Sequence, residues 1–546
     1  MEIDHQDFMD QISDLPDHIL HHIISFLSRR CAARTCILSK HWNYIWNSYP
    51  ILEFPQYSIY PWRCYSSPEI RRGKFRDFIK IVDSSIKRFT PFKLRVERFY
   101  LEAGLDHDDD SMLPTMVDRW IEFAMKNGVR EIGLLFDTRV TESRFYVLPE
   151  TTFVTSSSSY VKYCATFHSL RKLTLARVHM SEKMMKDITR NCPEIHSLIL
   201  LRCVGLKNLE ISKVEKLEVV EVTPSGGIRE LERVDIDAPK LRRFTFSTGF
   251  ESDLPCSISL SPSHNLKVLA LSECEIADDF FQMRNNLITF PLLEMLRISR
   301  CQMLRRIRMS APRLRWFSLF ACENIELIEM DAPTLSDFRL YVYRLPVLLL
   351  KNVPCRLKIS YVFHSTIPAD ASWFLELRTF VGTLTQSTTL ELKFYEDVEV
   401  SFDLQELQGA AIPPPLGVEH LILDLGLPIR TISKDQLATL IDGLLWSCHP
   451  KTISYDSCSC SKMQIMELLL EKLFNKENPE CCNTFHIKCW CHYLKSAQIL
   501  DSGGTKYEKL KDLEHFLDEL LSPTKGFGSL HEKLLMFELE WDFGWW

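Results

Sequence analysis

Hydrophobic residues in the middle of this chain recur in a six-residue pattern, in which the first, fourth and sixth positions are apolar. The pattern starts at Leu170, Ile195, Leu217, Leu241, Leu266, Leu293, Leu314 and Leu335, at intervals of 21 to 27 residues. Alternation of apolar and polar positions predicts a short strand with one buried face. Units of this length bury their apolar residues by stacking on their neighbours, so the pattern predicts a curved solenoid with its strands on the concave face.

A cysteine follows four of these runs, three residues after the last apolar position. These residues are Cys203, Cys274, Cys301 and Cys322. The spacing and the cysteine are typical of leucine-rich repeats. We interpret the four thiols as buried and structural, not reactive. A weaker apolar triple recurs between the main runs and ends three times at Asp/Ser-Ala-Pro, where proline stops strand pairing; this predicts a second flattened side.

The N-terminal 50 residues follow a helical period instead. Ile19, Leu20, Ile23, Ile24 and Leu27 recur at three- and four-residue spacing, and two further short helices are expected up to residue 50. So short a segment cannot bury this many large apolar groups internally. The pattern therefore predicts an apolar face that a partner covers.

The order of residues in this segment closely resembles the F-box, especially its plant form. The resemblance rests on Leu15-Pro16, on Ile19-Leu20, and on the ending Leu38-Ser39-Lys40-His41-Trp42. It implies docking onto a Skp-type adaptor, and through it a cullin, by Leu15, Pro16, Ile19, Leu20, Ile23, Leu27, Ile37 and Leu38. We expect Trp42 to brace the three helices internally.

The predicted fold class is α+β, with a short three-helix F-box followed by the curved leucine-rich-repeat solenoid. We expect an F-box at 10–55, capping helices and first repeat elements at 68–125, a solenoid at 126–430 and an end domain at 431–546. Phe75, Phe78 and Val82 mark an amphipathic helix that covers the first coil. The end domain resembles the FBD-type extension of plant F-box/leucine-rich-repeat proteins.

Composition and charge indicate which classes of partner are not expected. The 546 residues carry a net charge of −7, which gives no broad positive field, so no nucleic acid is expected to bind. No apolar stretch reaches the length of a membrane span, and the acidic first ten residues predict no secretory signal. The 18 cysteines are spread through a large chain, which favours reduced thiols in the nucleus or cytoplasm.

Candidate chemistry is sparse. Nucleotide-binding, zinc-protease and serine-hydrolase motifs are missing, so we expect neither an enzyme nor a cofactor. Asp106, Asp108 and Asp110 resemble the start of a calcium loop, but the required glycine and glutamate are absent, which favours a solvated acidic loop. Seven cysteines between 448 and 491, with His486 and His492, leave zinc as an alternative to buried thiols. Their spacing is not that of paired C-x-x-C knuckles, so no metal is predicted.

A target would contact the outward positions of the repeat strands. They include Arg242, Arg243, Lys267, Arg297, Arg315, Trp316 and Arg339, with Arg300 just past its strand. Arginine and tryptophan often dominate interface energy, and arginine pairs with carboxylates or phosphates. The sequence thus predicts a basic stripe for an acidic or phosphorylated segment. The alternative is a solvated face balanced by Glu218, Glu221, Glu294 and Asp337.

The resemblance implies a non-catalytic substrate-recognition subunit of a Skp–cullin–F-box ubiquitin ligase. Two alternatives stay open. One is a sensor of a small, hormone-like ligand, and the other is a scaffold that binds the adaptor without promoting degradation. No motif identifies the target.

Overall fold

A computed structural model of the chain describes most residues between Ile12 and Phe543. The described ranges are 12–59, 68–92, 94–105, 112–137, 144–153, 167–225, 231–247, 256–261, 264–281, 290–354, 357–363, 368–384, 388–394, 399–402, 406–407, 418–425, 433–457, 459–474, 489–500, 506–507 and 536–543. Contacts divide the chain into two compact units, Met1–Ser263 and His264–Trp546. Each unit is described by itself.

Three short helices open unit 1: α1 (Asp17–Ser25), α2 (Arg29–Arg34) and α3 (Lys40–Asn47), with a 3-10 turn at Thr35–Ile37. Two serines begin the second and third helices. The Ser28 hydroxyl accepts from the backbone N–H of Cys31, and the Ser39 hydroxyl accepts from that of Trp42. Such caps satisfy N–H groups that have no partner within the helix, so these polar residues fix where each helix begins.

A parallel sheet follows directly. Its strands, each paired with the next, are β1 (Ile51–Pro55), β2 (Arg98–Gly104), β3 (Glu131–Asp137), β5 (Lys172–Ala176), β7 (Ser197–Cys203), β9 (Val219–Pro224) and β11 (Arg243–Phe246). Buried residues alternate with outward ones along them, as the repeat pattern predicts. The sheet begins at Ile51, so the strand that ends the helical segment is also the first strand of the repeat.

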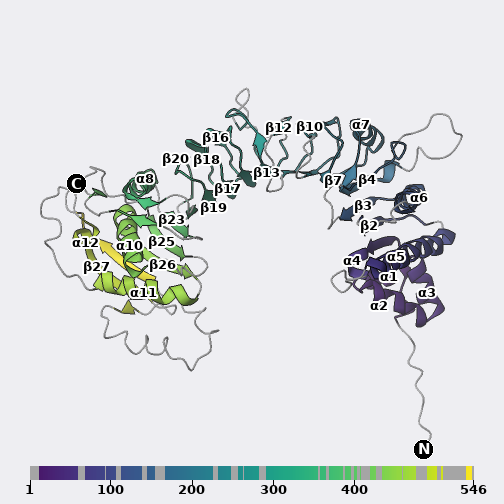
Figure 1. Cartoon of the computed structure of the whole chain (residues 1–546), viewed down its shortest axis with the longest axis horizontal. Helices are drawn as coiled ribbons and strands as arrows, with labels where there is room; N and C mark the ends of the chain where they lie inside the picture. The colour runs from purple at the N-terminus through teal and green to yellow at the C-terminus, as the bar shows by residue number, and fades with distance from the viewer. Residues whose placement is uncertain are drawn as a thin grey trace, which may run out of the picture. The chain divides into compact units, whose positions relative to one another are not determined.

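Helices connect these strands. They are α4 (Gln56–Ile59), α5 (Pro68–Phe89), α6 (Met112–Lys126) and α7 (Glu182–Asn191). Figure 1 shows α6 beside β2 and β3. In α5 the side chains of Phe75, Phe78 and Val82 are buried, as expected of an amphipathic helix that covers the first coil. Shorter pieces are 3-10 turns at Thr90–Phe92 and Phe167–Ser169 and the strands β4 (Tyr146–Val147) and β6 (Val178–His179).

Unit 2 repeats this architecture. Its parallel strands are β13 (Val268–Ser272), β15 (Met295–Ser299), β17 (Trp316–Phe320), β19 (Asp337–Tyr341), β21 (Leu357–Phe363), β23 (Thr388–Phe394), β25 (Val418–Leu425) and β26 (Thr452–Ser457). Three antiparallel strands then extend the sheet: β29 (Met536–Trp541), β27 (Leu494–Leu500) and β28 (Lys506–Tyr507).

A second set of strands forms the opposite side of the coils, as the weaker apolar triples predict. These strands are β8 (Asn208–Ser212), β10 (Arg233–Asp237) and β12 (Cys256–Leu260) in unit 1, and β14 (Cys274–Glu275), β16 (Arg306–Ser310), β18 (Leu327–Asp331), β20 (Val347–Lys351), β22 (Ala369–Asp370) and β24 (Val400–Ser401) in unit 2. Figure 1 shows β16 and β18 on one edge of the coils and β17 and β19 on the other. β10, β16 and β18 each end directly before Ala-Pro, which confirms the role inferred for proline.

Helices return towards the C-terminus: α8 (Ala371–Gly382), α10 (Lys434–Cys448), α11 (Ser459–Phe474) and α12 (Trp490–Tyr493). α8 and α10 pack tightly, since a Cβ at Gly443 would lie 2.4 Å from the Phe374 ring. Within the described ranges, no helix is both long and apolar enough to cross a membrane. Short helices followed by stacked parallel strands confirm the α+β class.

The cysteines of the repeat lie where the sequence placed them. Cys274, Cys301 and Cys322 are buried at the ends of their coils. Cys203 as a residue is partly exposed, but its thiol donates to the Leu175 carbonyl at 3.4 Å, and desolvation of the thiol raises its pKa to about 12. A thiol held protonated in this way is a poor nucleophile, in agreement with a structural role.

Candidate functional site

The N-terminal helices share one small core. Its buried members are Leu20, Ile24, Ala32, Trp42, Ile45 and Trp46. The Trp42 indole N–H also donates to the Ser13 hydroxyl at 3.0 Å, and the Trp42 side chain is only 4% exposed. The prediction that Trp42 braces the helices is therefore confirmed.

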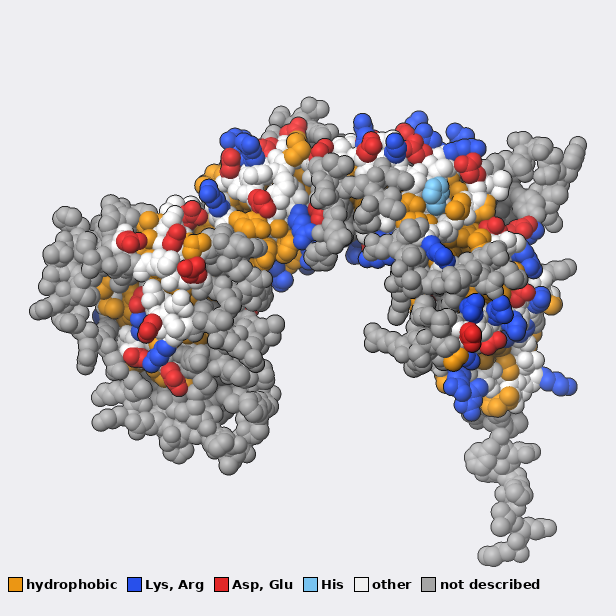
Figure 2. All heavy atoms as spheres, in the orientation of Figure 1, with side chains coloured by type: hydrophobic (Ala, Val, Ile, Leu, Met, Phe, Trp, Pro, Cys, Tyr) orange, Lys and Arg blue, Asp and Glu red, His pale blue; other side chains and the backbone are white. Residues whose placement is uncertain are grey.

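An apolar face remains outside this core. Its exposed side chains are Ile12, Ile19, Phe26, Leu27, Ile37 and Leu38. Ile37 is 83% exposed, Phe26 76% and Leu38 64%, so most of each of these side chains faces solvent. Figure 2 shows hydrophobic side chains among Lys and Arg on these helices. This many exposed large apolar side chains on one short segment make it a candidate site for a protein partner.

The eight residues predicted to bind the adaptor fall into three groups. Pro16, Ile19, Leu27, Ile37 and Leu38 are exposed, and Leu15 and Ile23 are partly buried against the core. Leu20 differs from the prediction: its side chain is fully buried, because α1 turns this position onto α3. Phe26 was missed, although it follows Ile19 at a helical interval of seven residues, which is the signal that could have revealed it.

The outward sheet face of unit 1 forms a groove of about 600 Å³ across β1 to β9. Arg98 lies in it and donates to Glu53 at 2.9 Å and to Glu131 at 2.8 Å. Tyr100 fits beside them only because residue 133 is glycine, since a Cβ there would lie 2.6 Å from its ring. Burial, and then the charge of Asp137, raise the pKa of Glu102 in the same groove. Carboxylates outnumber cations in this groove, and its arginine is already paired.

Two residues of the predicted basic stripe belong to unit 1. Arg243 begins β11 and is exposed. Arg242 directly precedes that strand, and its guanidinium lies 3.7 Å from the carboxylate of Glu218 on the neighbouring coil. Glu218 thus partly neutralises the stripe, as the alternative of a balanced face expects.

The outward sheet face of unit 2 has a different composition at its centre. Trp316 lies between two arginines, with 5.2 Å from its ring to the guanidinium of Arg297 and 5.5 Å to that of Arg339. Beside it the rings of Phe320 and Tyr341 stack at 4.4 Å and 12°. Strand register explains the cluster, because Trp316 pairs with Met295 and Asp337 while the arginines occupy the next outward row.

The remaining stripe residues of unit 2 lie at the strand ends. Lys267 contacts Glu294 at 2.8 Å just before its strand, and Arg315 precedes β17. Arg300 has a left-handed φ of 50° just after β15 and contacts the Glu273 carboxylate at 3.1 Å. The structure therefore brings together Arg297, Trp316 and Arg339, and it places the other stripe residues at the edges of the sheet.

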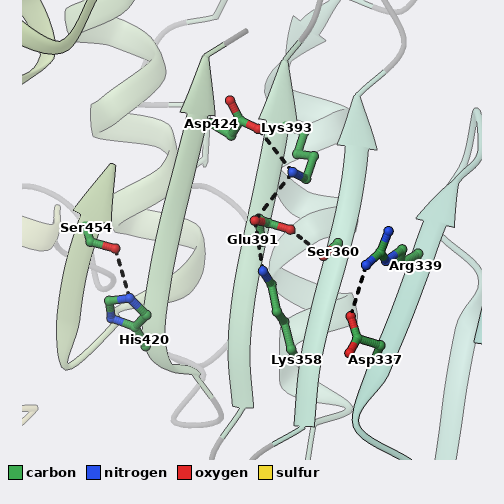
Figure 3. Close-up of polar contacts among 9 residues, drawn as sticks. All are labelled: Asp337, Arg339, Lys358, Ser360, Glu391, Lys393, His420, Asp424 and Ser454. Atoms are coloured by element: carbon green, nitrogen blue, oxygen red, sulfur yellow. Dashed lines mark hydrogen bonds and ion pairs between the residues drawn. The ribbon is translucent and has the colours of Figure 1, made fainter. Parts of the chain in front are cut away.

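Polar contacts that sequence reasoning missed lie on β19 to β26 in three separate sets: Arg339 with Asp337, His420 with Ser454, and a network around Glu391 (Figure 3). Glu391 accepts from Ser360 and from Lys358 at 3.0 Å, and Lys393 joins Glu391 to Asp424 at 3.1 Å. Burial alone would raise the pKa of Glu391, but these hydrogen bonds and the lysine charges lower it. The repeat spacing is irregular after residue 350, so the sequence pattern did not identify these positions as outward-facing.

The described residues hold no group of three or more possible metal ligands. Cys489 lies 3.1 Å from His492, and Cys448 is buried with a pKa raised by burial to about 12. Cys458, Cys481, Cys482 and His486 lie outside the described residues, as does the side chain of Cys460 and the acidic run Asp106, Asp108 and Asp110. The zinc and calcium alternatives are therefore untested.

Three family models match the chain. One described as "F-box domain" matches residues 12–54, and one described as "FBD-associated F-box protein At5g56370, LRR repeats" matches residues 117–278. A third, "At1g61320/AtMIF1, LRR domain", matches residues 252–389. The first match covers the helices with the apolar face and all but the last residue of the strand β1.

Proteins of Arabidopsis thaliana are similar over long segments. F-box/LRR-repeat protein 25 is 30% identical over 249 residues, which are 42% of this chain and 83% of that protein. Putative F-box/LRR-repeat protein At3g18150 is 29% identical over 53% of this chain and 57% of its own length. Putative F-box/LRR-repeat protein At5g02930 is 29% identical over 40% and 44% respectively. The chain thus spans about half the length of the last two relatives.

Proposed function

Because the chain belongs to the F-box/leucine-rich-repeat family, we propose that it is the substrate-recognition subunit of a Skp–cullin–F-box ubiquitin ligase. The observation that carries this proposal is the exposed apolar face beside a complete F-box core. Most of the apolar surface of Ile37 and Leu38 stays in water after folding, so a partner that covers them would bury it favourably. The subunit itself is proposed to be non-catalytic, with the ligase's chemistry supplied by its partners.

Co-purification of the full chain with a Skp-type adaptor tests the docking half. Replacing Ile37 and Leu38 by Asp should abolish it, because two charges would be buried without partners. The matched control replaces Val347 and Leu349 of β20, which are 52% and 45% exposed on the opposite side of the repeat. Loss of the adaptor in the control, or its retention by the F-box variant, would contradict the proposal.

We propose further that the target binds the cluster of Arg297, Trp316 and Arg339, through an acidic or phosphorylated segment. These residue types supply most of the binding energy in many interfaces, and guanidinium groups pair with carboxylates and phosphates in two-pronged contacts. Exposed aromatic surface beside them, at Phe320, adds apolar contact for the same segment.

Proximity labelling from a chain with Leu15 and Pro16 replaced, which should keep targets while losing the adaptor, tests this face. Charge reversal of Arg297, Arg315 and Arg339 together should remove the labelled targets. Charge reversal of Arg306, Arg308 and Lys351, on the opposite side of the same coils, is the control with the same change in net charge. Identical labelling by both triple variants would refute the site. Cullin co-purification and target abundance after proteasome inhibition then separate a ligase subunit from a scaffold.

A further inference from the structure

A cavity of about 270 Å³ lies at the junction between the F-box helices and the first repeat. The F-box supplies Ile24 and Ala32, the strand β1 supplies its edge, and α5 supplies Arg88. The cavity excludes Ile37, Leu38 and the sheet face of unit 2, but it shares Leu27 with the exposed apolar face and Glu53 and Pro55 with the groove of unit 1. It is large enough for a small polar molecule.

Two arginines line it from opposite sides of the junction. The Arg29 guanidinium, from α2, lies 4.3 Å from the Phe54 ring, and that of Arg88 lies 4.9 Å from the Trp46 ring. Arg29 also donates to the Glu53 carbonyl and to the Ser85 hydroxyl at 3.2 Å. Stacking on a ring holds the plane of a guanidinium and leaves N–H groups at its edge for another acceptor.

The positive charges of these two arginines are not balanced by any described carboxylate that pairs with them. The nearby Glu53 carboxylate accepts from Arg98 instead, at 2.9 Å. Within the described part of the chain, no carboxylate forms an ion pair with Arg88, and its Nε is buried without a hydrogen-bond partner. Burial, and then repulsion from Arg88, lower the pKa of Arg29 to about 10. A buried donor with no acceptor is costly, so a bound acceptor would be favourable.

We propose that this cavity binds a small oxyanion of the phosphate or phosphate-ester class between Arg29 and Arg88. Guanidinium forks match the geometry of phosphate oxygens, and an anion would relieve both the repulsion and the unpaired Nε. The hydroxyls of Tyr49 and Ser58 also line the cavity and can donate to the remaining oxygens.

Binding of an anion in this cavity would affect the stability of the junction between the F-box and the first repeat. Arg29 belongs to the F-box and Arg88 to the helix that covers the first coil, so one anion would join the two elements. Binding should therefore raise the thermal midpoint of the chain, because it stabilises only the folded junction. This inference does not depend on the proposed target or on ubiquitination.

Calorimetric titration of the full chain with inorganic phosphate and with pyrophosphate, at constant ionic strength, tests the proposal. We expect saturable binding of one anion per chain and a rise in thermal midpoint. Arg88→Gln should weaken binding by roughly tenfold or more, as expected for loss of charge-assisted hydrogen bonds. Arg88→Lys, which keeps the charge but loses the fork, should weaken it less. The control is Arg30→Gln, which replaces an exposed arginine of α2 next to Arg29 and should bind like the wild type.

Three outcomes would overturn the proposal. The first is a wild-type titration with no saturable heat for either anion. The second is equal weakening by Arg30→Gln and Arg88→Gln, which would indicate general charge screening. The third is displacement of the anion when the Skp-type adaptor binds, which would assign the cavity to a carboxylate of that partner. Tighter binding of pyrophosphate than of phosphate would support a phosphate ester as the natural ligand.

Discussion

The outward sheet faces of the two units have the same kind of strand, but Arg98 in unit 1 and Arg297 in unit 2 have opposite surroundings. In unit 1, Arg98 is held by two carboxylates, Glu53 and Glu131, and so helps to join β1, β2 and β3. In unit 2, Arg297 forms no ion pair with any described carboxylate and instead stacks on Trp316. Stacking on the ring leaves N–H groups at the edge of the Arg297 guanidinium, while Arg339 beside Arg297 pairs with Asp337 at 3.3 Å. The difference teaches that the repeat fixes where outward residues lie, while their neighbours decide whether they are free to bind.

The largest expected loss of stability is the same in both units, because the strands of each bury large apolar side chains between stacked coils. Phe244 in unit 1 and Phe317 in unit 2 are fully buried, and Phe317 stacks on Phe338 at 4.7 Å. Replacing either phenylalanine by alanine should cost about 3–5 kcal/mol in urea unfolding. The outward controls Thr245→Ala and Ser318→Ala should stay within about 0.5 kcal/mol. A core variant as stable as its control would show that the coil does not depend on that position.

The second prediction concerns the network of unit 2. Glu391→Gln should cost about 2 kcal/mol at neutral pH, because hydrogen bonds to a charged acceptor are lost and two lysines lose their partner. The pKa of Glu391 is lowered by folding, so its stabilisation is present above pH 4.5 and is lost as pH falls through the folded pKa. The variant and wild type should therefore converge in acid. Glu329→Gln, which breaks an exposed pair with Lys351, should cost less than about 1 kcal/mol.

The sequence could predict the interior of this protein better than its surfaces. The repeated spacing predicts that Leu296 and Phe317 are buried, because each coil of a solenoid covers the apolar residues of its neighbour. The sequence pattern does not show that Leu20 is buried while Phe26 is exposed. Both residues are apolar, and only the packing of the three helices decides which of them is covered. The strand β1 was missed because five residues without a repeat carry little pattern. Pairings such as Lys358 with Glu391 depend on register across coils, which one sequence does not contain.

The third prediction tests the arginine comparison directly. Arg98→Gln should cost about 0.5–1 kcal/mol, because it leaves the carboxylates of Glu53 and Glu131 facing each other, and the loss should shrink at high salt. Arg297→Gln should change stability by less than about 0.5 kcal/mol, because no described ion pair is lost. Both values come from thermal or urea unfolding of the full chain. A larger cost for Arg297→Gln would mean that this arginine serves the fold and is not available for a partner.

The smallest expected effect has the opposite sign. Folding raises the pKa of Glu102 above 4.5, through burial and then the charge of Asp137, so its favourable contribution exists below pH 4.5 and is lost as pH rises through the folded pKa. Glu102→Gln should therefore stabilise unit 1 at neutral pH, by about 0.5 kcal/mol after solvent screening is considered, and the gain should vanish in acid. The neighbouring Glu97→Gln, which breaks a pair with Arg130, should be mildly destabilising instead. Unfolding midpoints at pH 4 and pH 7 would then give mirror-image profiles for Glu102 and Glu391. Parallel profiles would show that the two faces do not differ in how their carboxylates are held.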